Sequence, residues 1–147
     1  MGTEACPMTP KGEFDRQLNL LRQVKRIAVV GMSPNPDRPS HEVGLYLREK
    51  GYEVVPVHPA AKTIAGLSVA PTLTLAASTG AAIDLVDLFV AGDRTMPLVR
   101  EAHTLGIKRI WFQPGAENAE AEALARELGL EVVTAACTMA VLERAQG

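Results

Sequence analysis

The sequence predicts an α/β domain of the doubly wound class, with a mainly parallel sheet of about five to six strands and helices on both faces. Short runs of branched apolar residues alternate along the chain with stretches whose apolar residues recur at helical spacing. Strands joined through helices in this way run parallel to one another. The length of 147 residues, with 47% apolar side chains, fits one domain with a substantial core.

Each element is predicted from its own local pattern. Phe14, Leu18 and Leu21 at helical spacing indicate a helix over residues 12–24, and residues 1–11 are expected to form a loose tail. Ser40 is a candidate N-cap for the second helix, and Gly51 is its stop signal. Strands are expected at residues 26–30, 52–57, 83–90, 108–112 and 130–133, with a very short edge strand near 67–70. The further helices are expected at residues 40–50, 72–78, 93–105, 118–128 and 138–146.

Composition and charge exclude several classes of function. The chain has 15 basic and 17 acidic side chains and is 4% aromatic, which leaves neither a basic surface nor stacking residues for a nucleic acid. Two cysteines, Cys6 and Cys137, are too few for a disulfide framework or a zinc site. No signal peptide is visible, and no apolar run approaches the roughly 20 residues of a membrane span. We therefore expect a soluble, cytoplasmic protein that contacts no membrane. The opening helix could cover the sheet or a second subunit, so a homodimer or another protein partner stays open.

The segment most informative about function is the loop over residues 31–40, GMSPNPDRPS, which follows the predicted strand IAVV. In a doubly wound sheet, ligands bind at the carboxyl ends of the strands, and phosphates lie at the amino terminus of a following helix. The loops at residues 31–40, 57–66, 91–96 and 113–118 should converge at that edge. By spacing alone, a rigid structural connection explains the Pro-rich loop equally well.

The residues around this loop narrow the choice of nucleotide. The NAD fingerprint needs three glycines and an acidic residue after the second strand. Here only Gly31 is present and the second strand ends in PVHP, so ordinary NAD binding is disfavoured. Arg38, His58 and Lys62 form a set suited to a ligand with more than one phosphate. A basic residue after the second strand also suits the 2'-phosphate of NADP, so an NADP-linked oxidoreductase stays an alternative.

Four blocks of the chain stand out together: IAVVGMSPNPDRPSHEVGLYLREKGYEVVPVHP at 27–59, IDLVDLFV at 83–90, IWFQPGAEN at 110–118, and a late Cys137 after LEVV. In these blocks the sequence resembles the small, single-domain CoA-binding proteins, which are similar to the CoA-binding amino-terminal domain of the succinyl-CoA synthetase alpha subunit. The resemblance extends from about Phe14 to Leu142. It implies a Rossmann-like domain that holds coenzyme A or an acyl-CoA non-covalently. Members of that family usually have Asn where this chain has His58.

The resemblance also implies which residues contact CoA. The pyrophosphate is expected near Ser33, Pro34, Arg38 and Ser40, with the other loop contacts at Gly31, Met32, Asn35 and Pro39. The adenosine is expected near Val57, His58, Pro59, Lys62 and Ile64, and the pantetheine arm near Phe89, Arg94, Gln113 and Gly115. Because CoA carries a 3'-phosphate, we hypothesise that Lys62 or His58 meets it. The three prolines of the loop would hold its backbone N–H groups open to the ligand.

No catalytic constellation is visible, so we expect no enzymatic activity from this chain alone. His41 and His103 are expected on solvated helix faces. Asp84 and Asp87 point to opposite faces of one strand, so they are not expected to act together, and one of them is expected to accept a structural hydrogen bond. An alternative function is a redox-responsive CoA carrier, in which Cys137 forms a mixed disulfide with the CoA thiol. A buried, inert cysteine is the competing interpretation.

Overall fold

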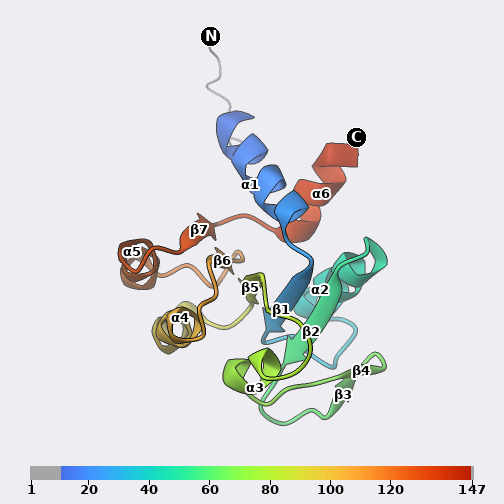
Figure 1. The fold of residues 1–147 in the computed structure, drawn as a ribbon. Helices are drawn as coiled ribbons and strands as arrows, with labels where there is room; N and C mark the ends of the chain where they lie inside the picture. Colours follow the sequence, from blue (N-terminus) through green and yellow to red (C-terminus); the bar gives the residue numbers. More distant parts are fainter. Residues whose placement is uncertain (1–10, 147) are drawn as a thin grey trace.

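The computed structural model describes residues 11–146, in which a central sheet is covered by helices on both sides (Figure 1). The predicted tail, residues 1–11, lies outside the described residues except for Lys11, which begins the first helix. The helices are α1 (Lys11–Gln23), α2 (Pro39–Glu49), α3 (Leu73–Ala77), α4 (Thr95–Thr104), α5 (Ala119–Glu127) and α6 (Thr138–Gln146). The strands are β1 (Arg26–Val30), β2 (Glu53–Val57), β3 (Thr63–Ile64), β4 (Leu67–Ser68), β5 (Leu85–Leu88), β6 (Arg109–Phe112) and β7 (Glu131–Thr134), and a short 3-10 helix, η2 (Gly92–Arg94), precedes α4.

Five strands form one parallel sheet in the order β2-β1-β5-β6-β7, which confirms the predicted fold class. The chain extends the sheet from β1 to β2, and then returns to the other side of β1 to add β5, β6 and β7. The direction of growth therefore switches between β1 and β5. Val30 pairs with Val57 on one side and with Leu88 on the other. The carboxyl ends of these three strands thus lie level at the switch point, where sheets of this class bind ligands.

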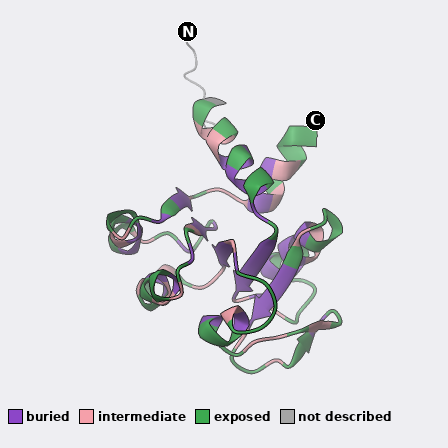
Figure 2. Ribbon diagram, viewed as in Figure 1, coloured by how far each residue is buried: buried purple, intermediate pink, exposed green. Residues whose placement is uncertain are grey.

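Successive side chains of each strand point to opposite faces of the sheet, so the core has two layers. The strands of the sheet are largely buried (Figure 2). In β1, Ile27 and Val29 pack in the layer with α1, α2 and α6, whereas Ala28 and Val30 pack in the layer with α3, α4 and α5. Every residue of β1 and β5 is buried. Burial on both faces explains why these strands are continuous apolar runs in the sequence.

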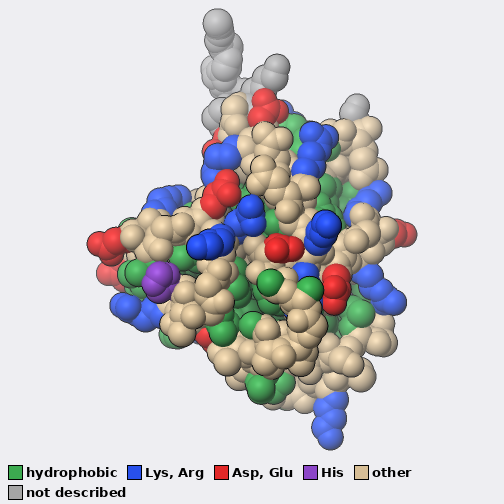
Figure 3. Space-filling model, viewed as in Figure 1, with side chains coloured by type: hydrophobic (Ala, Val, Ile, Leu, Met, Phe, Trp, Pro, Cys, Tyr) green, Lys and Arg blue, Asp and Glu red, His purple; other side chains and the backbone are tan. Residues whose placement is uncertain are grey.

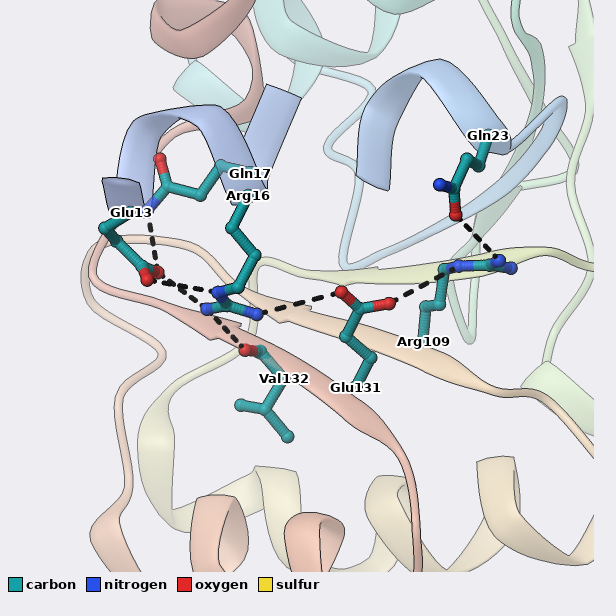
Figure 4. Close-up of polar contacts among 7 residues, drawn as sticks. All are labelled: Glu13, Arg16, Gln17, Gln23, Arg109, Glu131 and Val132. Carbon is teal, nitrogen blue, oxygen red and sulfur yellow. Dashed lines mark hydrogen bonds and ion pairs between the residues drawn. The ribbon is translucent and has the colours of Figure 1, made fainter. Parts of the chain in front are cut away.

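Helix α1 covers the chain's own sheet beside α6 (Figure 1) and is joined to the sheet edge by polar contacts (Figure 4). Arg16 Nη2 donates a hydrogen bond to the Val132 carbonyl oxygen at 3.0 Å. The same guanidinium bonds to Glu13 and lowers the pKa of that carboxyl. Arg16 and Arg109 also lie 3.8 and 3.7 Å from the Glu131 carboxylate. The opening helix was expected to cover either its own sheet or a second subunit, and in the structure it covers its own sheet.

Two local features differ from the sequence prediction. Ser40 is not the N-cap of α2: the cap is Arg38, because Pro39 with its fixed φ begins the helix. The Ser40 hydroxyl instead accepts a hydrogen bond from the Ser33 N–H at 2.9 Å. The single edge strand expected near residues 67–70 is a small antiparallel hairpin of β3 and β4.

Candidate functional site

A cleft of about 480 Å³ opens where the carboxyl ends of β1, β2 and β5 meet helices α3 and α4. We call it the His58 cleft. It lies at the switch point of the sheet, as the fold class predicts. It is lined by Val30, Gly31, Val57, His58, Pro59, Pro71, Thr72, Leu73, Phe89, Val90, Ala91, Arg94, Leu98 and Glu101.

A second hollow of about 370 Å³, the Arg38 depression, adjoins the His58 cleft. It is lined by Gly31, Ser33, Arg38, Pro39, Ser40, Phe89 and Pro114. Gly31 and Phe89 line both hollows, so together they form one strand-end groove. All four loops that were predicted to converge contribute lining residues, which confirms the convergence.

Hydrogen bonds within the loop over residues 31–40 fix its shape. Gly31 has a φ of +89° and donates its N–H to the Val57 carbonyl oxygen at 2.9 Å. The Asn35 N–H donates to Ser33 Oγ at 3.0 Å, and the Asp37 N–H donates to Asn35 Oδ1 at 2.9 Å. These N–H groups therefore already have acceptors in the protein. For Ser33, Asn35 and Asp37, the expectation that the prolines leave the N–H groups open to a ligand is wrong, because polar side chains of the loop accept them.

The amino terminus of α2 is the better place for an anion in the Arg38 depression. Its N-cap residue, Arg38, makes no side-chain capping bond, whereas Thr72 caps α3 and Asn118 caps α5. In α2, Pro39 has no N–H and the N–H groups of His41 and Glu42 donate to the Arg38 carbonyl oxygen, so the first turn offers chiefly the Ser40 N–H and the positive end of the helix dipole. Arg38 adds a full positive charge, and its guanidinium can bind two phosphate oxygens at once. Ser40, predicted as a contact, lines the same hollow.

His58 lines its cleft in a fixed orientation. Its Nδ1 accepts hydrogen bonds from the N–H groups of Ala60 at 3.1 Å and Ala61 at 3.0 Å. With Nδ1 acting as an acceptor, the ring carries its proton on Nε2 and offers that group as a donor. An Asn side chain accepts hydrogen bonds from the backbone a few residues further on in the same way. Either His or Asn at position 58 can therefore accept the N–H groups of the turn after β2.

We expect His58→Asn to keep this turn and His58→Ala to lose it. Removing the ring leaves two N–H groups without their acceptor, which costs about 1 kcal/mol of the free energy of unfolding. His58→Asn should remain within about 0.5 kcal/mol of the wild type. Urea unfolding of the three proteins measures the difference. Equal losses for both variants would show that the acceptor at Nδ1 is not what stabilises the turn.

Two of the basic residues predicted to contact the ligand, Arg94 and Lys62, lie elsewhere than expected. Arg94 lines the His58 cleft together with Pro59, so the structure groups it with the predicted adenosine contacts rather than with Gly115. Lys62 is exposed and lies outside the residues that line either hollow. Its carbonyl oxygen accepts the Val69 N–H, which holds this part of the chain in the β3–β4 hairpin. Contact of Lys62 with a 3'-phosphate stays a prediction.

Several other predicted contacts present little or no side chain to the groove. Met32, Ile64 and Gln113 lie in the core, at 0%, 2% and 1% exposure, and line neither hollow. A Cβ at Gly44 would lie 2.6 Å from the Met32 side chain, which shows how closely Met32 packs. Three further predicted residues are exposed but lie outside both linings: Pro34, Asn35 and Gly115.

A buried polar cluster lies beneath α6, in the layer opposite the His58 cleft. Gln113 Nε2 donates to Asp87 Oδ1 at 2.7 Å and to Thr138 Oγ1 at 2.9 Å, and the Thr138 hydroxyl donates to Asp87 Oδ2 at 3.2 Å. Burial raises the pKa of Asp87 from 3.8 to about 7, against the opposing effect of the bonds from Gln113 and Thr138. Asp87 accepts structural hydrogen bonds, as predicted. Asp84 does so too, from the N–H groups of Lys25 and Arg26.

The remaining candidate side chains do not join the groove. Cys137 is half-buried, and burial is the main cause that raises the pKa of its thiol. The neighbouring carboxyls of Asp87 and Glu143 act in the same direction. A raised pKa reduces the thiolate fraction that disulfide exchange requires.

His41 was expected on a solvated helix face, and this expectation is wrong. The residue is only 7% exposed, and its Nδ1 lies 2.8 Å from the Ser33 carbonyl oxygen.

Sequence reasoning missed part of the cleft wall. Leu98 and Glu101 were not predicted as site residues, yet both line the His58 cleft with Arg94. Arg94 is the N-cap residue of α4, and Leu98 and Glu101 follow it at i+4 and i+7, on one face of the helix. Since this helix follows a strand that ends at the groove, that face could have been proposed from the sequence. The lining residues of α3 carry no comparable signal.

A membrane-spanning helix and a cluster of metal ligands are both absent from the described residues. None of their helices is long and apolar enough to cross a membrane. Nor do three His, Cys, Asp or Glu side chains gather as a metal site anywhere in residues 11–146. On the face shown in Figure 3, basic and acidic side chains are interspersed, without a broad basic patch of the kind that binds a nucleic-acid backbone.

The sheet order and the groove at its switch point define a Rossmann-like α/β domain with a ligand groove across the strand ends. The chain belongs to the CoA binding domain family, whose model matches residues 25–143. An uncharacterized protein of Bacillus subtilis, YneT, is 32% identical over 118 residues, which are 80% of this chain and 85% of the relative.

Solved structures agree with this fold. A hypothetical protein from Pyrococcus horikoshii OT3 is 35% identical, with a TM-score of 0.85 over 100% of this chain and 99% of that chain. A dinucleotide-forming acetyl-coenzyme A synthetase of Ca. Korarchaeum cryptofilum is 21% identical, with a TM-score of 0.63 over 77% of this chain and 27% of that chain. The latter likeness concerns the fold alone.

Proposed function

We propose that this protein binds coenzyme A or an acyl-CoA non-covalently in the strand-end groove. The observation that carries the proposal is the continuity of the groove, in which Gly31 and Phe89 line both the His58 cleft and the Arg38 depression at the amino terminus of α2. The family to which the chain belongs supports the choice of CoA. The adenosine part would occupy the His58 cleft, and the pyrophosphate would lie at Arg38 and the amino terminus of α2.

The charges of the groove support this orientation. Arg38 lies in one hollow and Arg94 in the other, so an extended ligand with phosphates on both sides of its ribose meets a cation in each. His58, which lines the same cleft as Arg94, adds a donor at Nε2. Phe89, which lines both hollows, offers an apolar surface where they join.

We also propose that the chain performs no catalytic step of its own. The titratable side chains that line the groove are Arg38, His58, Arg94 and Glu101. Both His58 and Glu101 hold backbone N–H groups of neighbouring turns, and neither activates a nucleophile among these lining residues. Binding and presentation of CoA therefore fit the groove better than group transfer does.

Two measurements test the proposed ligand. Denaturing the purified protein and identifying any released small molecule by mass should yield free or acylated CoA. In thermal melts, CoA at about a hundredfold its dissociation constant should add roughly 2.7 kcal/mol, which is a shift of several degrees for a domain of this size. NADPH and NADH serve as controls. A larger shift with NADPH than with CoA would contradict the proposal and favour the NADP-linked alternative.

A further inference from the structure

The N-cap residue of α4, Arg94, and a residue within the helix, Glu101, line the His58 cleft with charges of opposite sign. Arg94, Leu98 and Glu101 follow at i, i+4 and i+7 and all line the cleft. Seven residues of helix span about 10 Å, so Glu101 lies two turns away from the strand-end mouth that Arg94 occupies. The cleft is thus lined by a cation at the start of α4 and by a carboxylate about two turns further along, with the apolar Leu98 between them in sequence.

The carboxylate of Glu101 is held in one orientation by α3. The backbone N–H of Thr74 donates to Glu101 Oε2 at 2.8 Å, and the Thr74 hydroxyl donates to the same oxygen at 2.5 Å. Both bonds use Oε2, which leaves Oε1 as the acceptor available to a ligand. A group positioned by such supporting bonds discriminates between ligands better than a freely rotating one.

The other lining residues of the cleft include apolar side chains, which can pack against the faces of a ring. Val30, Val57, Pro59 and Leu73 line the cleft with apolar surface, whereas Glu101 supplies a hydrogen-bond acceptor. A ring that carries an amino group on the edge remote from its phosphates matches this arrangement. Adenine is such a ring, since its 6-amino group donates hydrogen bonds.

We propose that Glu101 is a specificity-determining residue of the groove, whose Oε1 accepts a hydrogen bond from the 6-amino group of adenine. This inference rests on the proposed binding of CoA. Hypoxanthine carries a carbonyl oxygen in place of the amino group, so that two acceptors would face each other. A hydrogen bond to a charged group contributes about 1.5–3 kcal/mol, so the hypoxanthine analogue of CoA should bind roughly tenfold to hundredfold more weakly.

The test is isothermal titration calorimetry with CoA and with its hypoxanthine analogue, on the wild type, Glu101→Gln and Glu127→Gln. In Glu101→Gln the amide oxygen should stay with the Thr74 donors, which turns the amide NH₂ toward the ring. That donor pairs with the hypoxanthine carbonyl, so the preference should disappear or reverse. Glu127, an exposed residue at the end of α5, is the matched control and should leave the preference unchanged.

Each outcome separates this inference from the proposed function. Preference of the wild type for CoA together with its loss in Glu101→Gln supports the inference, because a purely structural role for Glu101 would weaken both ligands alike. Equal binding of both ligands by the wild type overturns it, even if the variant fails to fold, while CoA binding stands. An unchanged preference in Glu101→Gln also overturns it. Failure of the wild type to bind either ligand overturns the proposed function as well.

Discussion

Arg38→Ala is expected to weaken CoA binding roughly tenfold to hundredfold without changing the midpoint of thermal unfolding. The binding loss follows from the removal of charge-assisted hydrogen bonds to the pyrophosphate, which contribute about 1.5–3 kcal/mol. Stability should be unaffected because the Arg38 side chain is exposed and makes no capping bond to α2. Calorimetric titration at two salt concentrations measures both the affinity and its dependence on charge.

The choice of ligands shows which phosphate Arg38 meets. CoA and 3'-dephospho-CoA share the pyrophosphate, so both should lose affinity by the same factor in Arg38→Ala. Arg100→Ala is the matched control, because Arg100 is exposed on α4 and lies outside the groove lining. If only CoA loses affinity, Arg38 contacts the 3'-phosphate instead, and the assignment of the pyrophosphate to the end of α2 is wrong.

The fold could be predicted because its strands are buried on both faces and therefore stand out as apolar runs. The ends of the elements were less predictable. The apolar run at residues 83–90 is longer than β5, which covers only Leu85–Leu88. On either side of the strand, the Asp84 N–H bonds to the Arg26 carbonyl oxygen and the Phe89 N–H bonds to the Val30 carbonyl oxygen. Strand order had no local signal, since an apolar run does not identify its neighbours in the sheet.

The site was predictable where it depends on topology and unpredictable where it depends on packing. Arg38, His58 and Arg94 follow three parallel strands, so their convergence at one edge follows from the fold class. Met32 lies in the same loop, but its side chain turns into the core over Gly44, twelve positions later. Lys62 lies outside both linings because its carbonyl oxygen bonds to the Val69 N–H, beside the paired residues of the β3–β4 hairpin. Both outcomes depend on contacts between distant residues.

Asp87→Asn is expected to remove a pH dependence of stability that the wild type shows between about pH 4 and pH 7. Burial raises the pKa of Asp87 from 3.8 to about 7 in the folded protein. Between these values the folded state keeps a proton that the unfolded state has lost. Stability therefore falls as the pH rises through this window and levels off above it. Since each pH unit corresponds to about 1.4 kcal/mol, the loss reaches about 4 kcal/mol.

The Asn side chain keeps the size of Asp87, and its amide can still bond to Gln113 and Thr138 but carries no charge at any pH. The difference in the free energy of unfolding between Asp87→Asn and the wild type should therefore grow in favour of the variant from pH 4 to pH 8. Urea unfolding at several pH values measures it, with the exposed Asp15→Asn as the control that should leave the wild-type slope intact. A constant difference would mean that the Asp87 carboxyl is already ionised in the folded protein near pH 4. Carbon NMR of that carboxyl in the wild type decides the same question without any substitution, because its titration midpoint should lie near neutral pH.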